Sequence, residues 1–491
     1  MTGVTIGLDL GTTSVKGVLL HPDEGILASA GRTNRLSSPH AGWAEASPSQ
    51  WRENALSIIA ELAAVAARSA HTVTAVGTSG MVPAVVAIGG NGEPTRPAIL
   101  QNDSRAHHEV AEMARLLETK HPLERTGSPV TQQSVGPTAL WLERHEPEVW
   151  HRTSLIVGSY DWLLMALGAE AHVERNWAIE SGLFDLAAAE FEPAITAGHL
   201  QGRLAPAVSS GTVVGTMSSA LAAACGLTGE VSLVVGGADH VLSAVGAGLA
   251  TGGDWLVKLG GAGDILAVSG TPVVDERFYL DAHPVPGLWL PNGCMATSGS
   301  LVRWMQDVLQ EDDLAALDAR AASRPAAEVL CLPYFLGEKS PLNDPELRGV
   351  FAGLHLGTDR YDLYRAVLEG VAFGFRHNAE ALRSAGVPLD AATVSDGGAN
   401  SMLWKRIHAS VLATPLRTLR HHPGASLGAA VAAAIGVGDL PGWQAMARFV
   451  LPGVTVDPEP QLVDRYDEAY ALWRQLGDST GAVMHALSRR R

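Results

Sequence analysis

Residues 4–20 read VTIGLDLGTTSVKGVLL, two apolar segments separated by a turn of small residues. In the first segment Ile6, Leu8 and Leu10 alternate with smaller or polar side chains, which predicts a β-strand, and the second segment predicts a returning strand. The turn contains Gly11, which lacks a Cβ and lets backbone N–H groups approach a ligand closely. The segment therefore predicts a β-hairpin with a ligand-accessible turn.

The turn of this hairpin gathers groups that suit a metal–phosphate complex. Asp9 ends the first strand, Thr12 and Thr13 add hydroxyl donors, and Lys16 adds a positive charge. A carboxylate beside N–H and O–H donors suits a divalent metal that carries phosphate, with Asp9 holding the metal or its waters. A structural hairpin in which Asp9 caps a tight turn is the alternative at this point.

Length and composition favour a globular protein of two or more domains. The 491 residues are 46% hydrophobic and 18% charged, which excludes a disordered chain. The net charge of −16 disfavours nucleic acid and anionic membranes as partners. We expect Cys225, Cys294 and Cys331 to be buried thiols in a reducing compartment. A strand expected from Val4 leaves no signal peptide, and the Ala-rich segments are too short to span a bilayer, so a cytoplasmic location is expected.

A second carboxylate stands at another strand end. A β-branched strand predicted over 231–235 leads into Gly236-Gly237-Ala238-Asp239 and then into a helix of small residues. A helix N-terminus favours the ionised form of Asp239, and an ionised carboxylate beside a phosphate turn can act as general base toward a hydroxyl. An ordinary N-cap aspartate is the alternative.

The opening hairpin has a weak repeat near mid-chain. Residues 255–268, WLVKLGGAGDILAV, again form an apolar strand ending in Leu-Gly, a small-residue turn and a returning strand. The repeat predicts two similarly folded halves, each with a phosphate turn, and a nucleotide-binding cleft between them. We place the domains at 1–245 and 246–491. The second turn contains Gly260 and Gly261.

Other local features complete the expected pattern. Polar residues at 101–105 stand at a strand-to-helix junction, where ligands bind in open α/β sheets, although an N-cap role for the aspartate is the alternative. Paired glycines at 397–398 open a predicted helix over 402–411 and suit a flat ligand or phosphate. We also expect a loop at 175–178, helices over 192–204 and 425–437, and a turn over 349–354.

These motifs resemble the FGGY family of carbohydrate kinases, within the actin-like ATPase superfamily. The family's C-terminal signature fits Gly349-x-Phe351-x-Gly353-Leu354, followed after seven residues by DLxxAVLE at 362–369. The resemblance implies an α/β fold of two actin-like (RNase H-like) domains, with mixed sheets flanked by helices and hinged around a central cleft. It also implies ATP and Mg²⁺ as cofactors, a sugar or polyol substrate, and a homodimer.

The resemblance assigns roles residue by residue. Asp239 is the implied general base and also contacts substrate, and Asp9 and Asp239 are the implied metal ligands. The implied nucleotide-binding residues are Gly11, Thr12, Thr13, Lys16, Gly260, Gly261, Gly397, Gly398, Ala399 and Ser401. The implied substrate-binding residues are Met81, Val82, Asn102, Asp103 and Arg105.

Three departures from the family pattern bear on the substrate. Xylulokinases look most similar in length and in the residues at 96–105, so the implied reaction is ATP-dependent phosphorylation of a ketopentose such as xylulose. Yet Met81 is followed by Val82-Pro83 where xylulokinases commonly have histidine, Thr138 replaces a lysine, and Gly261 lacks a hydroxyl. A kinase for another ketose or a linear polyol, or a catalytically weakened ATP- and sugar-binding regulator, are the alternatives.

Overall fold

The chain folds into two compact units, each built from separate segments. The computed structural model describes residues 3–490 except 118–121, 132, 192–199 and 201. Unit 1 comprises Met1–Ala250, Val274–Leu288 and Pro423–Val450, and unit 2 comprises Thr251–Val273, Trp289–His422 and Leu451–Arg491. The units are therefore not two continuous halves of the chain. The expected helix at 192–204 lies largely outside the described residues.

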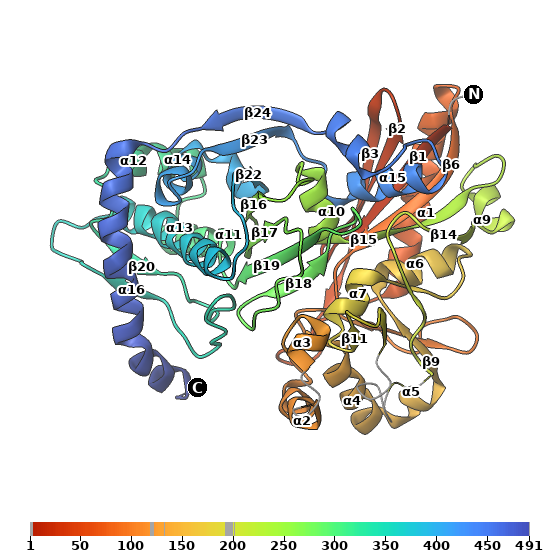
Figure 1. The fold of residues 1–491 in the computed structure, drawn as a ribbon, viewed down its shortest axis with the longest axis horizontal. Coiled ribbons are helices and arrows are strands. Elements are labelled where there is room, and N and C mark those ends of the chain that lie inside the picture. The colour runs from red at the N-terminus through yellow and green to blue at the C-terminus, as the bar shows by residue number, and fades with distance from the viewer. Residues whose placement is uncertain (1–2, 118–121, 132, 192–199, 201, 491) are drawn as a thin grey trace. The chain divides into compact units, whose positions relative to one another are not determined.

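Unit 1 is organised around a six-stranded mixed sheet (Figure 1). In spatial order its strands are β14 (Val213–Thr216), β15 (Ser232–Ala238), β6 (Thr72–Gly80), β1 (Gly3–Leu10), β2 (Ser14–His21) and β3 (Gly25–Thr33). Its helices are α1 (Pro48–Arg68), α2 (His107–Leu117), α3 (Pro122–Thr126), α4 (Val135–His145), α5 (Pro147–Arg152), α6 (Ser159–Leu167), α7 (Arg175–Glu180), α9 (Ser219–Ala224), α10 (Asp239–Gly246), α15 (Ala425–Gly436) and the 3₁₀ helix η3 (Trp443–Arg448).

Short strands outside the main sheet complete unit 1. They are β4 (Leu36–Ser37), β5 (Glu45–Ala46), β7 (Val86–Gly89), β8 (Ala98–Ile99), β9 (Thr153–Val157), β10 (Val173–Glu174), β11 (Phe184–Asp185), β12 (Glu190–Phe191), β13 (Ala207–Val208) and β18 (Tyr279–Ala282).

Unit 2 repeats the sheet topology of unit 1. Its main-sheet strands run in the order β19 (Trp289–Met295), β17 (Gly263–Ala267), β16 (Asp254–Leu259), β22 (Ala391–Ser395), β23 (Leu416–His421) and β24 (Leu451–Val456). Its other elements are β20 (Leu330–Leu332), β21 (Val350–Ala352), α11 (Gly299–Leu309), α12 (Leu314–Ala322), α13 (Arg360–Ser384), η2 (Gly397–Asn400), α14 (Met402–Val411) and α16 (Pro460–Ser488).

The two sheets match strand by strand. In unit 1 the antiparallel chain β1–β2–β3 is followed on the other side of β1 by the parallel strands β6 and β15. In unit 2 β16, β17 and β19 are antiparallel, and β22 and β23 lie parallel to β16. An antiparallel strand closes each parallel edge, β14 in unit 1 and β24 in unit 2. The predicted repeat and the mixed α/β fold are confirmed.

Helix α15 packs on the sheet of unit 1 at unusually short range. A Cβ at Gly7 would lie 2.1 Å from the Ser426 carbonyl oxygen, and one at Gly77 would lie 2.3 Å from that of Ala429. Only glycine permits this approach, because any side chain would overlap the helix backbone. In Figure 1 the blue helix α15 accordingly lies beside the red strands of the N-terminus.

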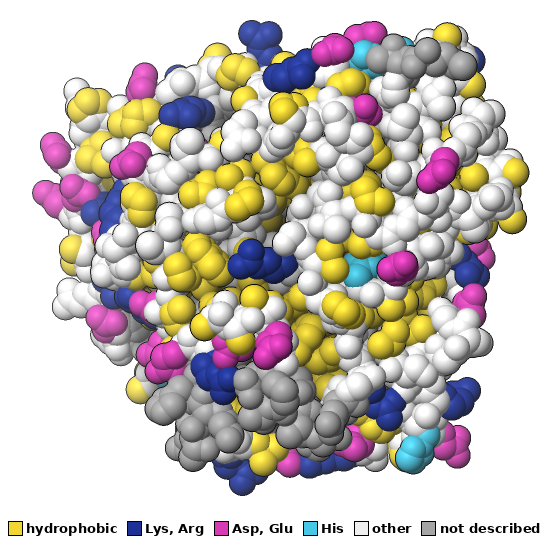
Figure 2. Space-filling view, turned by 45° about the vertical axis from the view of Figure 1, so that its right-hand side comes forward, with side chains coloured by type: hydrophobic (Ala, Val, Ile, Leu, Met, Phe, Trp, Pro, Cys, Tyr) yellow, Lys and Arg dark blue, Asp and Glu magenta, His cyan; other side chains and the backbone are white. Residues whose placement is uncertain are grey.

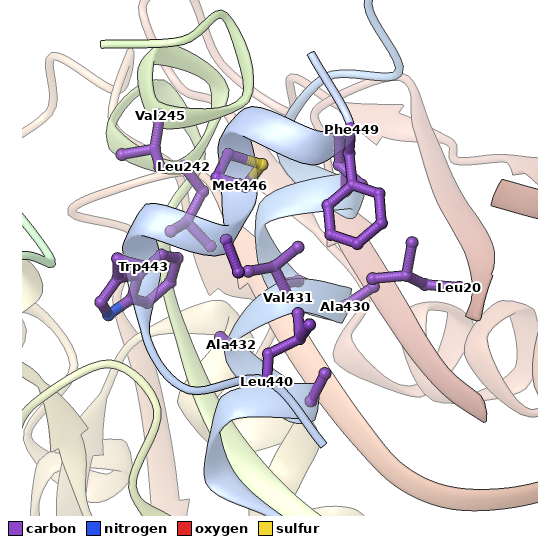
Figure 3. Close-up of a cluster of buried hydrophobic side chains, with 14 of the residues drawn as sticks. Leu20, Leu242, Val245, Ala430, Val431, Ala432, Leu440, Trp443, Met446 and Phe449 are labelled. Atoms are coloured by element: carbon purple, nitrogen blue, oxygen red, sulfur yellow. The ribbon is translucent and has the colours of Figure 1, made fainter. Parts of the chain in front are cut away.

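The opposite face of α15 contributes to a hydrophobic cluster. Leu242 and Val245 from α10 pack there with Val431 of α15, and Trp443 and Met446 of η3 close the cluster (Figure 3). These side chains are at most 7% exposed. The cluster fixes α10, the helix that begins at Asp239, onto the unit 1 core.

Two local expectations are wrong. Residues 175–178 form the start of α7 rather than a loop, because the Glu174 carboxylate accepts the N–H groups of Asn176 and Trp177 and caps the helix. Trp177 is fully buried and donates to the Ala84 carbonyl at 2.9 Å, so it is a core residue. Residues 349–354 contain strand β21, which pairs with β20.

Candidate active site

The register of the unit 1 sheet brings the two key carboxylates to one edge. Asp9 lies opposite Ser79, and Gly80 lies between Leu10 on one side and Ala238 on the other. The carboxyl ends of the parallel strands β1, β6 and β15 therefore deliver Asp9, Met81 and Asp239 to the same edge. This is where ligands bind in open α/β sheets.

Two backbone carbonyl groups of the turn between β1 and β2 accept hydrogen bonds from Asn34. Asn34 donates from its backbone N–H to the Thr13 carbonyl and from its side chain to the Gly11 carbonyl, both at 2.8 Å. Thr13 and Lys16 are exposed, and Lys16 lies opposite Asp9 in the hairpin register. With these carbonyls engaged, the turn presents hydroxyl groups and a cation to solvent.

Asp239 combines access with a fixed orientation. It is the first residue of α10, and its side chain is 38% exposed. The backbone N–H of His240 donates to Asp239 Oδ1 at 2.6 Å, and no described residue donates to Oδ2. One oxygen is thus bound by the protein and the other is available to a substrate.

A cluster that the sequence did not reveal lies behind this carboxylate. His240 Nε2 is 2.9 Å from Asp281 Oδ2 and 3.6 Å from Glu180 Oε1. Burial and the charge of Asp281 raise the pKa of Glu180 well above its usual value. Burial alone would lower the pKa of His240, but Asp281 and the hydrogen bond to Asp239 raise it well above its usual value.

The predicted sugar-side residues occupy different environments. Asn102 is exposed, whereas Asp103 and Arg105 are buried. Asp103 accepts the Ala44 N–H at 2.6 Å and three hydrogen bonds from Arg105, one from its backbone N–H and two from its guanidinium, which stacks 3.7 Å from the Trp43 ring centroid. The Asp103 carboxylate thus already accepts four hydrogen bonds from the protein. Its contact with a sugar stays a prediction.

The strand end at β6 is apolar where a histidine would be expected. Met81 and Val82 are buried, and the Thr12 hydroxyl lies 3.9 Å from Met81 Sδ. Ser159 donates its hydroxyl to the Met81 carbonyl at 3.3 Å. The side chains of Met81 and Val82 therefore supply apolar walls and no charge.

Unit 2 contains a cavity of about 580 Å³ at its own strand ends. Its lining includes the predicted residues Gly260, Gly261, Gly397, Gly398 and Ser401, together with Leu259, Gly299, Val302, Arg303, Gln306, Leu314, Ala315, Asp318, Tyr364, Leu368, Asn400 and Trp404. The volume and the mix of apolar walls with a few polar groups are typical of a small-molecule site. Ala399 instead lines an adjoining cavity of about 470 Å³.

The second hairpin turn lies against the start of α11. The N–H groups of Gly299 and Ser300, at the start of α11, donate to the carbonyls of Gly260 and Gly261 at 2.8 and 3.0 Å. Arg303, one turn along α11, places Nη2 3.2 Å from where a Cβ of Gly261 would stand. It is exposed and forms no ion pair with the described residues. The Arg303 charge therefore lies beside Gly261, the position at which the family pattern has a hydroxyl side chain and this chain has none.

Two further groups in unit 2 have structural partners. The Asp264 carboxylate forms an ion pair with Lys258 at 3.1 Å across the hairpin. Ser401 caps α14 by accepting the Trp404 N–H and bonds to the Asp318 carboxylate. Sequence inspection missed Gly299 and Arg303, although the Ser-Gly-Ser turn before an amphipathic helix is a usable signal.

Family models match both parts of the chain. The model for the N-terminal domain of the FGGY family of carbohydrate kinases matches residues 4–246, and that for the C-terminal domain matches residues 259–437. The chain belongs to the FGGY family of carbohydrate kinases. It is therefore an enzyme that uses ATP to phosphorylate a sugar hydroxyl.

Individual relatives of the kinase agree over nearly full length. The crystal structure of a xylulose kinase from Rhodospirillum rubrum is 41% identical, with a TM-score of 0.91 and coverage of 98% of this chain and 100% of that one. A xylulose kinase from Staphylococcus epidermidis is 28% identical over 488 residues, 97% of each chain. One from Klebsiella pneumoniae is 30% identical over 441 residues, 87% of this chain and 88% of that one.

The surface and cysteines of the kinase fit these findings. On the face in Figure 2, basic side chains lie singly or in small groups among acidic and apolar ones. Within the described residues, every helix is too short or too polar to cross a membrane. The three cysteines are free, and Cys225 and Cys331 are buried as expected. Cys294, which lies opposite Asp264 in the pairing of β17 and β19, is only partly buried.

Proposed function

We propose that this kinase phosphorylates a ketopentose such as xylulose, with Asp239 as the general base. The sheet register carries the proposal, because it delivers Asp9 and Asp239 to one edge and leaves Asp239 Oδ2 without a protein donor. The names of the relatives support the substrate class.

The chemical step is an in-line phosphoryl transfer. Asp239 accepts the proton of the sugar hydroxyl while the hydroxyl oxygen attacks the γ-phosphorus of ATP. A bond forms between that oxygen and phosphorus, the bond from phosphorus to the β,γ-bridging oxygen breaks, and ADP leaves with the electron pair. Asp239 then releases its proton to solvent through the exposed side of its carboxylate.

Nucleotide binding is assigned to the two hairpin turns and the unit 2 cavity. The turn from Gly11 to Lys16 offers hydroxyl groups and a cation, and the turn at Gly260 and Gly261 offers backbone N–H groups beside Arg303. In unit 2, a Cβ at Gly398 would lie 2.5 Å from the Trp404 ring, so this glycine keeps the floor of the cavity flat. A flat floor and apolar walls suit an adenine base.

Mg²⁺ is the metal that these residues fit. Asp9 and Asp239 offer carboxylate oxygens, the hard ligands that Mg²⁺ prefers when it also carries substrate phosphates. The bound ion would neutralise charge on the phosphate oxygens. A homodimer and a cytoplasmic location complete the proposal, the latter supported by the three free cysteines.

A kinase for another ketose or a linear polyol is the second candidate. The buried Val82 and Pro83 supply no polar contact where xylulokinases commonly place a histidine. An apolar wall there would tolerate a substrate that lacks the group which a histidine would bind.

The test is ADP release by the purified kinase with Mg²⁺-ATP across a panel of pentuloses, hexuloses and linear polyols. We expect strong stimulation by a ketopentose. Stimulation by only a hexulose or polyol would replace the substrate assignment and leave the base assignment intact. ATP hydrolysis that no panel compound stimulates would contradict the substrate class. Omitting Mg²⁺ and adding EDTA in the same assay tests whether the reaction needs the metal. Full activity under these conditions would exclude a requirement for Mg²⁺.

A further inference from the structure

The side chain of His240 is enclosed by three acidic residues. Its Nε2 lies 2.9 Å from Asp281 Oδ2 and 3.6 Å from Glu180 Oε1, and its Nδ1 lies 3.5 Å from Asp239 Oδ1. Asp281 is fully buried, and the side chains of His240 and Glu180 are 12% and 14% exposed. The imidazole thus stands between a buried carboxylate and the proposed base.

The chemistry of these groups fixes the ring orientation. A carboxylate accepts hydrogen bonds and does not donate them, so both ring nitrogens of His240 donate, Nε2 toward Asp281 and Nδ1 toward Asp239. Rotation of the ring would break the hydrogen bond to Asp281 and leave a buried carboxylate without its partner.

The acids that hold the ring are themselves fixed by the backbone. Glu180 ends α7, and Asp281 lies in β18. Asn176 of α7 donates to the Ala282 carbonyl at 3.0 Å and accepts the Ala282 N–H at 2.7 Å, which ties the helix to the strand. Because β18 is tied to α7, the Asp281 side chain is held in place and can in turn hold the His240 ring in a fixed position.

Only one oxygen of Asp239 faces this support. The backbone N–H of His240 and the ring Nδ1 both approach Oδ1, at 2.6 and 3.5 Å, and Oδ2 is left for the substrate. Hydrogen bonds that are long without ligand commonly tighten when substrate binds. The carboxylate is therefore restrained on one side and open on the other.

We propose that His240, hydrogen-bonded to Asp281, is a positioning residue that fixes the Asp239 carboxylate for proton abstraction. The inference rests on the proposed role of Asp239. A base displaced by about 1 Å loses about a hundredfold in rate, so the contribution of His240 appears in kcat.

The experiment compares His240→Gln, Asp281→Asn and the double variant by steady-state kinetics with Mg²⁺-ATP and the best panel sugar. Glutamine retains a donor that can reach Asp281 and so protects folding, but it has no donor in the Nδ1 position. We expect His240→Gln to lower kcat by about ten- to a hundredfold with KM for sugar and ATP nearly unchanged. Asp281→Asn should lower kcat in the same way.

The double variant tests whether Asp281 acts through His240. We expect Asp281→Asn to have little further effect on kcat in the His240→Gln background, since the contact that it supports is already gone. If the double variant instead lost kcat by the product of the two single losses, Asp281 would not act through His240. His172→Ala is the matched control, because His172 is also a buried imidazole beside a buried acid, with Nε2 3.8 Å from Asp161. It should change thermal stability but not kcat.

The outcomes separate this inference from the base assignment. A normal kcat for His240→Gln, with Asp239→Asn inactive, would overturn the positioning role alone. A raised sugar KM with unchanged kcat would make His240 a sugar ligand instead and also overturn it. An active Asp239→Asn enzyme would remove the base assignment whatever the His240 variants do.

Discussion

The hydroxyl of Thr5 donates a hydrogen bond of 2.9 Å to the backbone carbonyl of Ala430, across 425 positions of the chain. Thr5 lies near the start of β1, the strand that ends beside Asp9, and Ala430 lies in α15. Both groups are buried, so this contact and the glycines around it fix the distance between the helix and the unit 1 sheet.

Gly7→Ala should prevent unit 1 from folding correctly. The new methyl group would stand 2.1 Å from the Ser426 carbonyl oxygen and 2.3 Å from the Ala430 nitrogen, both backbone atoms that cannot move separately from α15. We expect a loss of more than about 3 kcal/mol in unfolding free energy, or insoluble protein, because overpacking here displaces a whole helix. Urea unfolding followed by circular dichroism measures the change.

The matched control for that substitution is Gly90→Ala. A Cβ at Gly90 makes only an ordinary contact of 3.5 Å with the Ser154 hydroxyl. Its stability should stay close to that of the wild type. Equal unfolding midpoints for the two variants would show that the close approach of α15 does not limit stability.

Asp239→Asn should fold and bind sugar but lose turnover by about a thousandfold or more. The amide keeps the shape of the side chain and cannot accept the hydroxyl proton in the transition state. The kcat for ADP release measures the loss, and calorimetric titration with sugar measures the retained binding. Turnover within a few-fold of the wild type would show that another group accepts the proton.

Arg303→Ala should weaken ATP binding more than sugar binding. A charge-assisted hydrogen bond contributes about 1.5–3 kcal/mol, so we expect KM for ATP to rise by about ten- to a hundredfold. Adding Gly261→Ser to Arg303→Ala should restore part of the affinity by supplying a hydroxyl. Arg383→Ala is the control, since Arg383 is exposed in the last turn of α13 away from the cavity lining. An unchanged ATP KM for Arg303→Ala would exclude the phosphate contact.

Glu338 should make the stability of unit 2 decrease as pH rises. Burial raises the pKa of Glu338 to about 7 from 4.5, although it accepts the N–H groups of Ala296 and Lys339. The folded state therefore keeps a proton that the unfolded chain releases, so stability is full below pH 4.5 and is lost as pH approaches about 7.

Glu338→Gln tests this pH dependence. The variant keeps an oxygen acceptor and removes the ionisation, so its unfolding free energy relative to the wild type should rise between pH 4.5 and 7 by at most roughly 3 kcal/mol. Urea unfolding at pH 5 and pH 7.5 measures the difference. A constant difference between wild type and variant at both pH values would show that Glu338 ionises normally.

The sequence predicted those parts of the fold in which local pattern determines structure. The two Leu-Gly hairpins, the strand ends at Asp9 and Asp239 and the alanine-rich helix were all predictable, because alternation, glycine turns and small-residue composition act over a few neighbours. The loop expected at 175–178 was wrong because one buried side chain, Glu174, caps it as a helix. A cap supplied by a glutamate in the interior has no reliable local signal.

Other parts of the candidate site depend on distant segments. Nothing in the residues around Asp281 distinguishes it from a surface acid, because its partner His240 is 41 positions away. Arg303 is significant only because α11 begins against the carbonyls of Gly260 and Gly261. Similarly, the hydrogen bonds that Asp103 accepts from Ala44 and Arg105 could not be read from the sequence around it, and its contact with a sugar stays a prediction.

The return of residues 423–450 to unit 1 sets the order in which the protein can be completed on the ribosome. The helix that covers the face of β1 is made more than 400 positions after that strand. At about 5–20 residues per second, that face waits roughly 20–80 s for its cover. Before α15 is made, that face of β1 lacks its cover, and apolar surface exposed during synthesis favours aggregation.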